Sequence, residues 1–357
     1  MQLEHSQRLK QHIESLLSLW RVNNKRSPLS DSEALSVSKA LLELQRGLTG
    51  GRELAGSAYM QNKNLLGAYL LYYWPVSYMQ ISFCIDYFSA DFGLIAGQKE
   101  LSILDVGSGP GPASFAAADY GLKTNPALRV DVDLLDSSSR ALDLAKKIFL
   151  TRSESFSVKT QVVNLENTDF SFLQKKYDII IVSHALNELW KGKENSLEKK
   201  EEMLLLLRGF LKKGGILLLC EPALLLTSRA LIQLRDFLVK NGMSVLAPCC
   251  PSLEDCPALK AGENQTCHAE LLWKPVEVVA KLARLSKLDR TSVKMAFFAF
   301  REEENPGAKE SQSSYRVVSD PMLNKSGRVR FLLCDGKRRL AFSAKKDYTI
   351  STFSRIY

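Results

Sequence analysis

The chain has 357 residues, 45% of them hydrophobic and 24% charged, a composition typical of a globular protein with two or three packed units. Its formal net charge of +9 favours an anionic partner such as RNA. No apolar run reaches the roughly 18 to 20 residues of a membrane span, and the N-terminus lacks the apolar segment of a signal peptide, so we expect a cytoplasmic protein without a membrane partner.

Residues 1–95 are predicted to form an N-terminal helical region. Apolar side chains recur at three-to-four spacing, and Ser30 followed by Glu33 predicts a capping box. An aromatic-rich helical stretch follows, which Pro75 is expected to kink or divide. The region is either a helical cap that packs on the next domain or a lid that faces a substrate.

Residues 96–301 alternate between short apolar strands and helices. The predicted strands have the sequences ELSILDVGS, RVDVDLLDS, VKTQVVNLE, YDIIIVSHA and GGILLLCEP. Such alternation is typical of a parallel sheet covered on both faces by helices. We therefore predict an α/β fold with a Rossmann-like sheet, which also carries a cysteine-rich insertion at residues 247–270.

Residues 302–357 are predicted to form a linker, at 302–314, and a small basic β-appendage. From Lys325 to the end there are nine Lys or Arg residues against two Asp or Glu, and Asp335-Gly336 predicts a hairpin turn. Positive side chains on such a hairpin would neutralise RNA phosphate groups. These are Arg328, Arg330, Lys337, Arg338 and Arg339.

A glycine-rich turn in ILDVGSGPGPASF carries the most specific chemical signal. Gly107, Gly109 and Gly111 separate a strand from a helix, and glycine lets the backbone approach a ligand closely. Asp136 ends the next strand, where a carboxylate can accept hydrogen bonds from ribose hydroxyls. Both a dinucleotide and S-adenosylmethionine fit this pattern. The expected cofactor-binding residues are Asp105, Gly107, Ser108, Gly109, Gly111, Asp136 and Ser183.

Three details favour S-adenosylmethionine. DVGSGPG, with its acidic residue on the strand, resembles motif I of class I methyltransferases. Pro112 stands where a dinucleotide loop has its last glycine, and YDIIIVSHALNEL and LKKGGILLLCEP resemble the fourth and fifth strand motifs of that fold. No catalytic residue can be assigned. The Pro-Pro-aromatic motif of amino methylation is missing, His184 is either a base or a cofactor-ordering residue, and Cys249 is a weak candidate nucleophile.

Four of the seven cysteines, Cys249, Cys250, Cys256 and Cys267, lie within nineteen residues of one another. A cytosolic chain disfavours disulfides, and the spacing differs from common zinc knuckles. It suits an iron–sulfur cluster held by thiolates from an irregular loop, although zinc and unligated thiols stay open. Cys334, just before the hairpin turn, is the best further ligand, because Cys84 and Cys220 lie in apolar segments.

Five motifs of the chain together resemble those of the methyltransferase-like proteins associated with the mitochondrial small ribosomal subunit, and of their bacterial relatives. These motifs are DVGSGPG, YDIIIVSHALNEL, LLLCEP, APCCPSLEDCP and GRVRFLLCDG. The resemblance covers about residues 65–357. It implies a 4Fe–4S cluster, with Cys250 preferred over Cys249 because proline follows it, although a slip of one residue would exchange the two. The implied ligands are Cys250, Cys256, Cys267 and Cys334.

The resemblance also implies a factor that assembles the small ribosomal subunit, binds its rRNA and holds S-adenosylmethionine. We expect the free protein to be a monomer. The alternatives are an active rRNA methyltransferase and a zinc-stabilised methyltransferase of small molecules. A bacterial protein would act in the cytoplasm and a eukaryotic one in the mitochondrial matrix. Ser252 and Ala269 replace family residues beside the cysteines, and no arginine accompanies Trp74 and Pro75.

Overall fold

The computed structural model describes residues 2–21, 28–49, 62–152, 156–250, 252, 254–302, 314–323, 325 and 327–356. The predicted linker at 302–314 lies outside this part of the chain, apart from its first and last residues. None of the helices in the described part combines the length and the apolar character that crossing a membrane requires.

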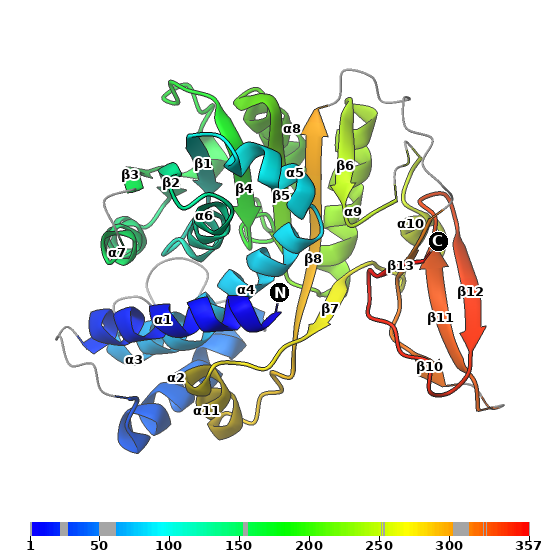
Figure 1. The fold of residues 1–357 in the computed structure, drawn as a ribbon. Coiled ribbons are helices and arrows are strands. Elements are labelled where there is room, and N and C mark those ends of the chain that lie inside the picture. Colours follow the sequence, from blue (N-terminus) through cyan, green and yellow to red (C-terminus); the bar gives the residue numbers. More distant parts are fainter. Residues whose placement is uncertain are drawn as a thin grey trace. The chain divides into compact units, whose positions relative to one another are not determined.

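The predicted fold class is confirmed (Figure 1). The architecture is mixed α/β, with a central sheet that is mainly parallel, helices in the N-terminal region and a separate small antiparallel sheet at the C-terminal end. The chain divides into two compact units, each assembled from separate stretches of sequence. The first consists of Met1–Ile85, Gly93–Thr168 and Leu272–Val293, and the second of Asp86–Phe92, Asp169–Leu271 and Lys294–Tyr357.

The first unit contains three parallel strands in the order β3-β2-β1. Their register sets Val106 beside Leu135, so the turn after β1 and Asp136 at the end of β2 lie at the same edge. Ser138 caps the helix after β2 by accepting the N–H of Ala141 at 3.1 Å. The elements are β1 (Glu100–Val106), α6 (Pro112–Thr124), β2 (Arg129–Asp136), α7 (Ser139–Leu150), β3 (Phe156–Val162) and the 3₁₀ turn η3 (Leu165–Asn167).

The predicted N-terminal helices belong to the same unit. The capping box is confirmed, because Ser30 Oγ accepts the N–H of Glu33 at 3.3 Å and Glu33 Oε2 accepts the N–H of Ser30 at 2.9 Å. The N-terminal helices of this unit are α1 (Gln2–Arg21), α2 (Asp31–Thr49), α3 (Lys63–Ala68), the π-helix η2 (Tyr69–Tyr73) and α4 (Trp74–Asp86). The unit also contains α11 (Glu277–Leu285), and α5 (Ser89–Ala96) is divided between the two units after Phe92.

Pro75 changes the helix type rather than ending the helix. The chain continues from η2 (Tyr69–Tyr73) directly into α4 (Trp74–Asp86). Proline has no N–H and its ring crowds the carbonyl group four residues earlier, here that of Leu71. The wider turn of a π-helix just before Pro75 accommodates this conflict, and such π segments are frequent at functional sites.

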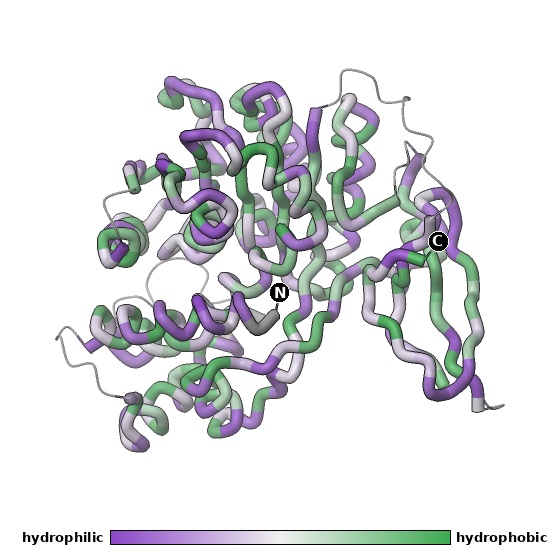
Figure 2. Tube along the Cα trace, in the orientation of Figure 1, coloured by the Kyte–Doolittle hydropathy of each residue, from purple (hydrophilic) through white to green (hydrophobic). Residues whose placement is uncertain are grey.

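The second unit contains the buried inner strands and an antiparallel extension. β4 and β5 are parallel, with Ser183 beside Cys220, and β8 runs antiparallel to both β5 and β6. β4 and β5 are hydrophobic along most of their length (Figure 2). The elements are β4 (Tyr177–Ser183), α8 (Ser196–Arg208), β5 (Leu211–Glu221), α9 (Leu225–Lys240), β6 (Met243–Ala247), α10 (Pro257–Lys260), β7 (Ala269–Leu272) and β8 (Ser292–Glu302).

The predicted β-appendage is a small antiparallel sheet of the second unit. Val317, Val329, Phe331 and Leu333 form its apolar core. The predicted hairpin joins β11 to β12, whose ends pair Cys334 with Arg339. Its strands are β9 (Tyr315–Val317), β10 (Met322–Leu323), β11 (Val329–Cys334), β12 (Arg339–Ala344) and β13 (Arg355–Ile356).

Candidate functional site

The glycine turn between β1 and α6 takes a shape that only glycine adopts without strain. Gly107, Gly109 and Gly111 have φ angles of 72°, 52° and 73°, in the left-handed region. The N–H groups of Gly107 and Ser108 both donate to the carbonyl oxygen of Leu135, at 2.8 and 2.9 Å. The turn is therefore fixed to the end of β2.

Asp136 also holds this turn. Its Oδ2 accepts the N–H of Gly109 at 2.8 Å and its Oδ1 accepts the N–H of Ser138 at 2.8 Å. The N–H of Ser137 also donates to this carboxylate, which keeps an acceptor site for another donor. The structure thus brings together six of the seven predicted cofactor-binding residues within the first unit: Asp105, Gly107, Ser108, Gly109, Gly111 and Asp136.

Asp105 lies beneath the turn, on β1. Its Oδ2 accepts the N–H of Ser114 at 3.1 Å, whereas its buried Oδ1 has no hydrogen-bond partner in the described structure. Burial raises the pKa of Asp105 to about 6, opposed by the hydrogen bonds from Ser114. Asp105 therefore fixes the start of α6 and remains a buried acceptor next to the turn.

The N-terminal helical segment contacts the turn directly, which the sequence alone did not reveal. The indole N–H of Trp74 donates to the carbonyl oxygen of Pro110 at 3.1 Å, and both groups are buried. A Cβ atom on Gly109 would lie 3.3 Å from the hydroxyl oxygen of Tyr69. The π-helix and the start of α4 therefore place aromatic side chains against the glycine turn. They do so in the segment that lacks the arginine expected from the resemblance.

In the second unit, buried polar atoms gather at the carboxyl ends of β4 and β5. The hydroxyl oxygen of Ser183, the remaining predicted cofactor-binding residue, is buried with no hydrogen-bond partner in the described structure. His184 follows it with a φ of 57°, and burial lowers the pKa of its ring to about 4. The ring is thus neutral at pH 7, as a base or a cofactor-ordering group would be.

Glu221, at the end of β5, is a candidate that the sequence reasoning missed. It is buried, its Oε1 accepts the N–H of Leu186 at 2.9 Å, and its Oε2 has no hydrogen-bond partner within the described residues. Burial raises the pKa of Glu221 to about 8, opposed by hydrogen bonds from the backbone. The signal in the sequence was a single carboxylate at the end of the otherwise apolar run ILLLCE.

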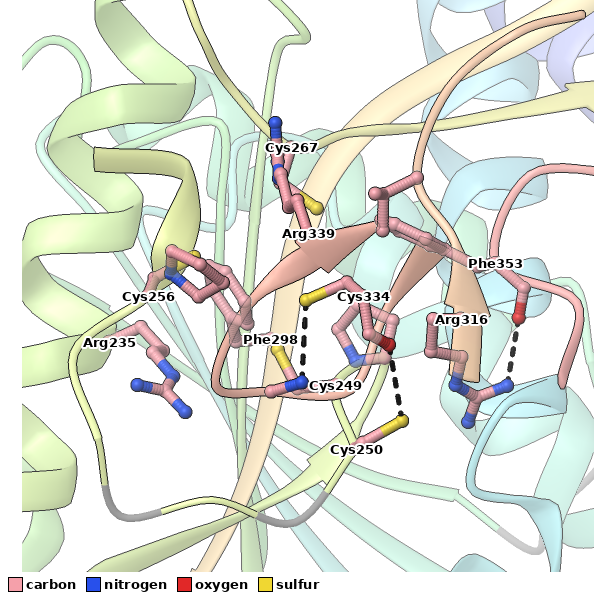
Figure 3. A pocket seen from close by; sticks show the side chains of 14 residues that line it. Arg235, Cys249, Cys250, Cys256, Cys267, Phe298, Arg316, Cys334, Arg339 and Phe353 are labelled. Atoms are coloured by element: carbon pink, nitrogen blue, oxygen red, sulfur yellow. Dashed lines mark hydrogen bonds between the residues drawn. The ribbon is translucent and has the colours of Figure 1, made fainter. Parts of the chain in front are cut away.

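A second candidate site lies in the same unit, where five cysteines line one pocket (Figure 3). The cavity between the side chains is small, about 20 Å³, which is room for about one water molecule. Its thiols come from the loop after β6, the start of α10, the segment before β7 and the end of β11. They belong to Cys249, Cys250, Cys256, Cys267 and Cys334.

The thiol of Cys250 points away from the other four in Figure 3. It donates to the carbonyl oxygen of Ser314 at 3.2 Å and lies 3.7 Å from that of Cys334. The sulfur of Cys334 accepts the N–H of Gly336 at 3.4 Å, in the hairpin turn. The pocket thus brings together Cys256, Cys267 and Cys334, three of the four ligands that the resemblance implies, with Cys249 rather than Cys250 facing them.

The four facing thiols influence one another electrostatically. The pKa of Cys249 is raised to about 12, mainly by burial and also by the thiols of Cys256 and Cys334, against the opposing effect of Arg235. Burial raises the pKa of Cys267 well above its usual range, reinforced by Cys256, Cys249 and Cys334. Burial also raises the pKa of Cys334 to about 11. At neutral pH these groups are thiols, so a bound cation must displace their protons.

As they stand, the described residues contain no group of three or more His, Cys, Asp or Glu side chains that could hold a metal ion. The thiols line a space and do not converge on one point. Their chemistry nevertheless fits a thiolate-bound centre, because the lining includes no carboxylate and does include Arg235, Arg316 and Arg339.

The predicted phosphate-binding side chains divide into two groups. Arg328, Arg330, Lys337 and Arg338 are exposed on the appendage, and the turn between β11 and β12 is hydrophilic in Figure 2. Arg339 is partly buried instead, and donates to the carbonyl oxygen of Thr266 at 2.7 Å. The hairpin therefore carries an exposed basic surface on one side and contributes Arg339 to the cysteine pocket.

The sequence model of a family described as mitochondrial small ribosomal subunit Rsm22 matches residues 66–348, about four fifths of the chain. A comparison with curated proteins finds no match. A similar solved structure is a putative class I S-adenosylmethionine-dependent methyltransferase from Listeria monocytogenes, 12% identical, with 86% of this chain and 91% of that chain covered and a TM-score of 0.42.

Two further solved structures show a similarly low sequence identity to this chain. TehB from Haemophilus influenzae is 14% identical, with 61% of this chain and 62% of that chain covered and a TM-score of 0.36. A SAM-dependent methyltransferase from Agrobacterium tumefaciens is 14% identical, with 61% and 62% covered and a TM-score of 0.37. The chain thus spans less than two thirds of the length of either protein.

We expect Glu221→Gln to become more stable relative to the unchanged protein as the pH rises from about 5 to about 8. Folded Glu221 keeps its proton up to a pKa of about 8, whereas a glutamic acid in the unfolded chain loses it above about pH 4.3. Between these values the folded state binds the additional proton, so stability falls with rising pH, by at most about 1.4 kcal/mol per pH unit.

Urea unfolding at pH 5, 6.5 and 8 measures this difference. Exposed Glu263 is the matched control, because Glu263→Gln should change the free energy of unfolding equally at each pH. A stability difference for Glu221→Gln that does not depend on pH would contradict the buried, protonated state.

Proposed function

We propose that this chain, which belongs to the mitochondrial small ribosomal subunit Rsm22 family, is an assembly or maturation factor of the small ribosomal subunit. It binds S-adenosylmethionine and rRNA and carries a 4Fe–4S cluster. The pocket lined by five cysteines is the observation that carries the proposal. All five cysteines lie within the matched residues, as does the glycine turn. The protein acts in the compartment of its ribosome, a bacterial cytoplasm or a mitochondrial matrix.

The glycine turn is the proposed site of S-adenosylmethionine. Its left-handed glycines leave the backbone open to a close ligand, and the Asp136 carboxylate keeps an acceptor site for a ribose hydroxyl. Tyr69 and Trp74 hold the turn from the side of the helical segment. When bound, the cofactor would supply an electrophilic methyl group; the residues described here bind and orient it.

Gly109→Ala should weaken binding of S-adenosylmethionine by about 5- to 30-fold. The free variant relaxes the strained turn, and restoring its left-handed φ on binding costs about 1–2 kcal/mol; the new Cβ would also lie 3.3 Å from the Tyr69 hydroxyl. Isothermal titration calorimetry measures the change. Gly192, with a φ of 75° and open space around it, is the matched control, because Gly192→Ala introduces similar strain away from the turn. Equal affinities in a folded Gly109→Ala protein would contradict the site.

Cys249, Cys256, Cys267 and Cys334 are the proposed ligands of the cluster. The resemblance favoured Cys250, but the Cys250 thiol is directed to the carbonyl oxygens of Ser314 and Cys334. Cys249 instead faces the other three (Figure 3). When bound, the cluster would supply iron atoms that tie the loop after β6 to the end of β11 and that can accept an electron.

Cys249→Ser should remove most of the iron and sulfide from anaerobically purified protein, whereas Cys250→Ser should keep both. Serine lacks the soft thiolate that iron–sulfur clusters require. Iron and acid-labile sulfide analysis, together with the broad absorbance near 400 nm, measures the cluster content. The two neighbouring variants are controls for each other. A reversed outcome would restore Cys250 as the ligand, and colourless unchanged protein with one bound zinc would contradict the cluster itself.

The exposed cations of the appendage are the proposed contacts to rRNA phosphate. Replacing both Arg330 and Lys337 with glutamine should weaken binding to small-subunit rRNA and reduce the slope of log K against log salt by about one for each lost contact. Filter binding at several salt concentrations measures the slope. Lys191, an exposed lysine outside the appendage, is the control. A slope unchanged by the double substitution would place the RNA contact elsewhere.

A second candidate function is methyl transfer to rRNA. Its specific support is the pair of buried atoms without a hydrogen-bond partner in the described structure, Ser183 Oγ and Glu221 Oε2, on neighbouring strand ends. Such atoms are normally satisfied by a ligand or water. Transfer of labelled methyl groups to rRNA from a strain that lacks the protein distinguishes an enzyme from a factor that only binds the cofactor.

A further inference from the structure

Three arginines line the cysteine pocket, and each has one N–H donor without a hydrogen-bond partner among the described residues. Arg235 comes from α9, Arg316 from β9 and Arg339 from β12. The Nε atom of each is buried and has no hydrogen-bond partner in the part of the chain that the structure describes. An unpaired buried donor is costly and is normally satisfied by a ligand or by ordered water.

The terminal nitrogens of these arginines are, in contrast, held in place. Arg235 donates to Asp236 Oδ1 at 2.7 Å and to the carbonyl oxygen of Glu254 at 2.6 Å. Arg316 donates to the carbonyl oxygen of Phe353 at 2.8 Å. Arg339 is fixed in the same way by the carbonyl oxygen of Thr266. The guanidinium groups are therefore immobilised, and their free N–H groups are not a consequence of loose side chains.

The positive charge at the pocket exceeds the negative charge. Asp236 is the ion-pair partner of Arg235, but neither Arg316 nor Arg339 forms an ion pair with a described residue. Arg316 is only 6% exposed, with its guanidinium carbon 5.9 Å from the centre of the Tyr87 ring, and burying a cation without an anionic partner is unfavourable. Because the lining contributes only thiols as acidic groups, the pocket is complementary to an anion.

Each arginine lies close to a different subset of the thiols. The charge of Arg235 interacts with Cys249 and Cys256, and that of Arg316 with Cys249 and Cys250. The charge of Arg339 interacts with Cys256, Cys267 and Cys334. Together the charges of the three guanidinium groups act on all five thiols of the pocket.

We propose that Arg235, Arg316 and Arg339 are positioning residues of the metal centre, which donate their Nε–H groups to its sulfur atoms and balance its negative charge. The inference rests on the proposed cluster and adds a property to it. A cluster with four thiolates is anionic and gains a further negative charge on reduction, so fixed cations stabilise the reduced form more strongly. The arginines therefore raise the reduction potential of the centre.

The experiment uses the full-length protein, purified or reconstituted anaerobically, with the variants Arg316→Gln, Arg316→Lys and Arg339→Gln. Iron and sulfide content, the midpoint potential from a spectro-electrochemical titration and the thermal midpoint are measured for each. Arg301 provides the matched control. It also has a buried, unpaired Nε, but it pairs with Asp91 and does not line the pocket.

Both glutamine variants are expected to shift the midpoint potential to more negative values. Arg316→Lys keeps the charge but loses the Nε donor, so its potential should lie between those of the unchanged protein and Arg316→Gln. Arg301→Gln should leave the potential unchanged. A role confined to stability would lower the thermal midpoint without moving the potential, so this readout separates the two roles.

Full cluster content with unchanged potentials in Arg316→Gln and Arg339→Gln would overturn the proposal. If the glutamine variants do not fold, the potential of Arg316→Lys decides in the same way, a negative shift supporting the proposal and an unchanged value overturning it. Unchanged protein that takes up no iron and sulfide would overturn the cluster proposal, and this one with it, before any variant is compared. The two failures are therefore distinguishable.

Discussion

The arrangement of the first unit depends on holding the backbone of the glycine turn in its left-handed conformation. Three left-handed residues in five positions cannot hold their shape unaided, because glycine is flexible. The Asp136 carboxylate binds the N–H of Gly109 from one side, and the Trp74 indole binds the carbonyl oxygen of Pro110 from the other. The turn thus depends equally on the end of β2 and on the helical segment.

That helical segment is in turn fixed by a buried charge. The carboxylate of Asp119 in α6 lies 2.6 Å from His12 Nε2 and accepts the hydroxyl group of Tyr78 at 2.7 Å, and Arg152 lies 2.6 Å from its other oxygen. Burial pushes the pKa of Asp119 upward, but these partners hold it below its usual value. α1 and α4 are therefore bound to the helix that begins at the glycine turn, as a packed cap requires and a mobile lid would not.

The sequence predicted the features that depend on local pattern. Alternating apolar strands, the glycine spacing, the capping box at Ser30 and the hairpin at Asp335 each follow from residues close together in the chain. Burial could not be predicted in this way. The protonated state of Glu221, the direction of the Cys250 thiol and the convergence of Arg235, Arg316 and Arg339 depend on neighbours that are distant in sequence.

The cysteine pocket and the basic hairpin share the same short stretch of backbone. Cys334 ends β11, its sulfur accepts the N–H of Gly336, and exposed Lys337 follows at once. Arg339, two residues later, turns back to the pocket and is held by Thr266. A metal centre bound through Cys334 would therefore fix the conformation of the turn that presents Lys337 to phosphate. Within the proposed function, RNA affinity should follow cluster occupancy because both depend on this turn, even though no phosphate contact involves the pocket itself.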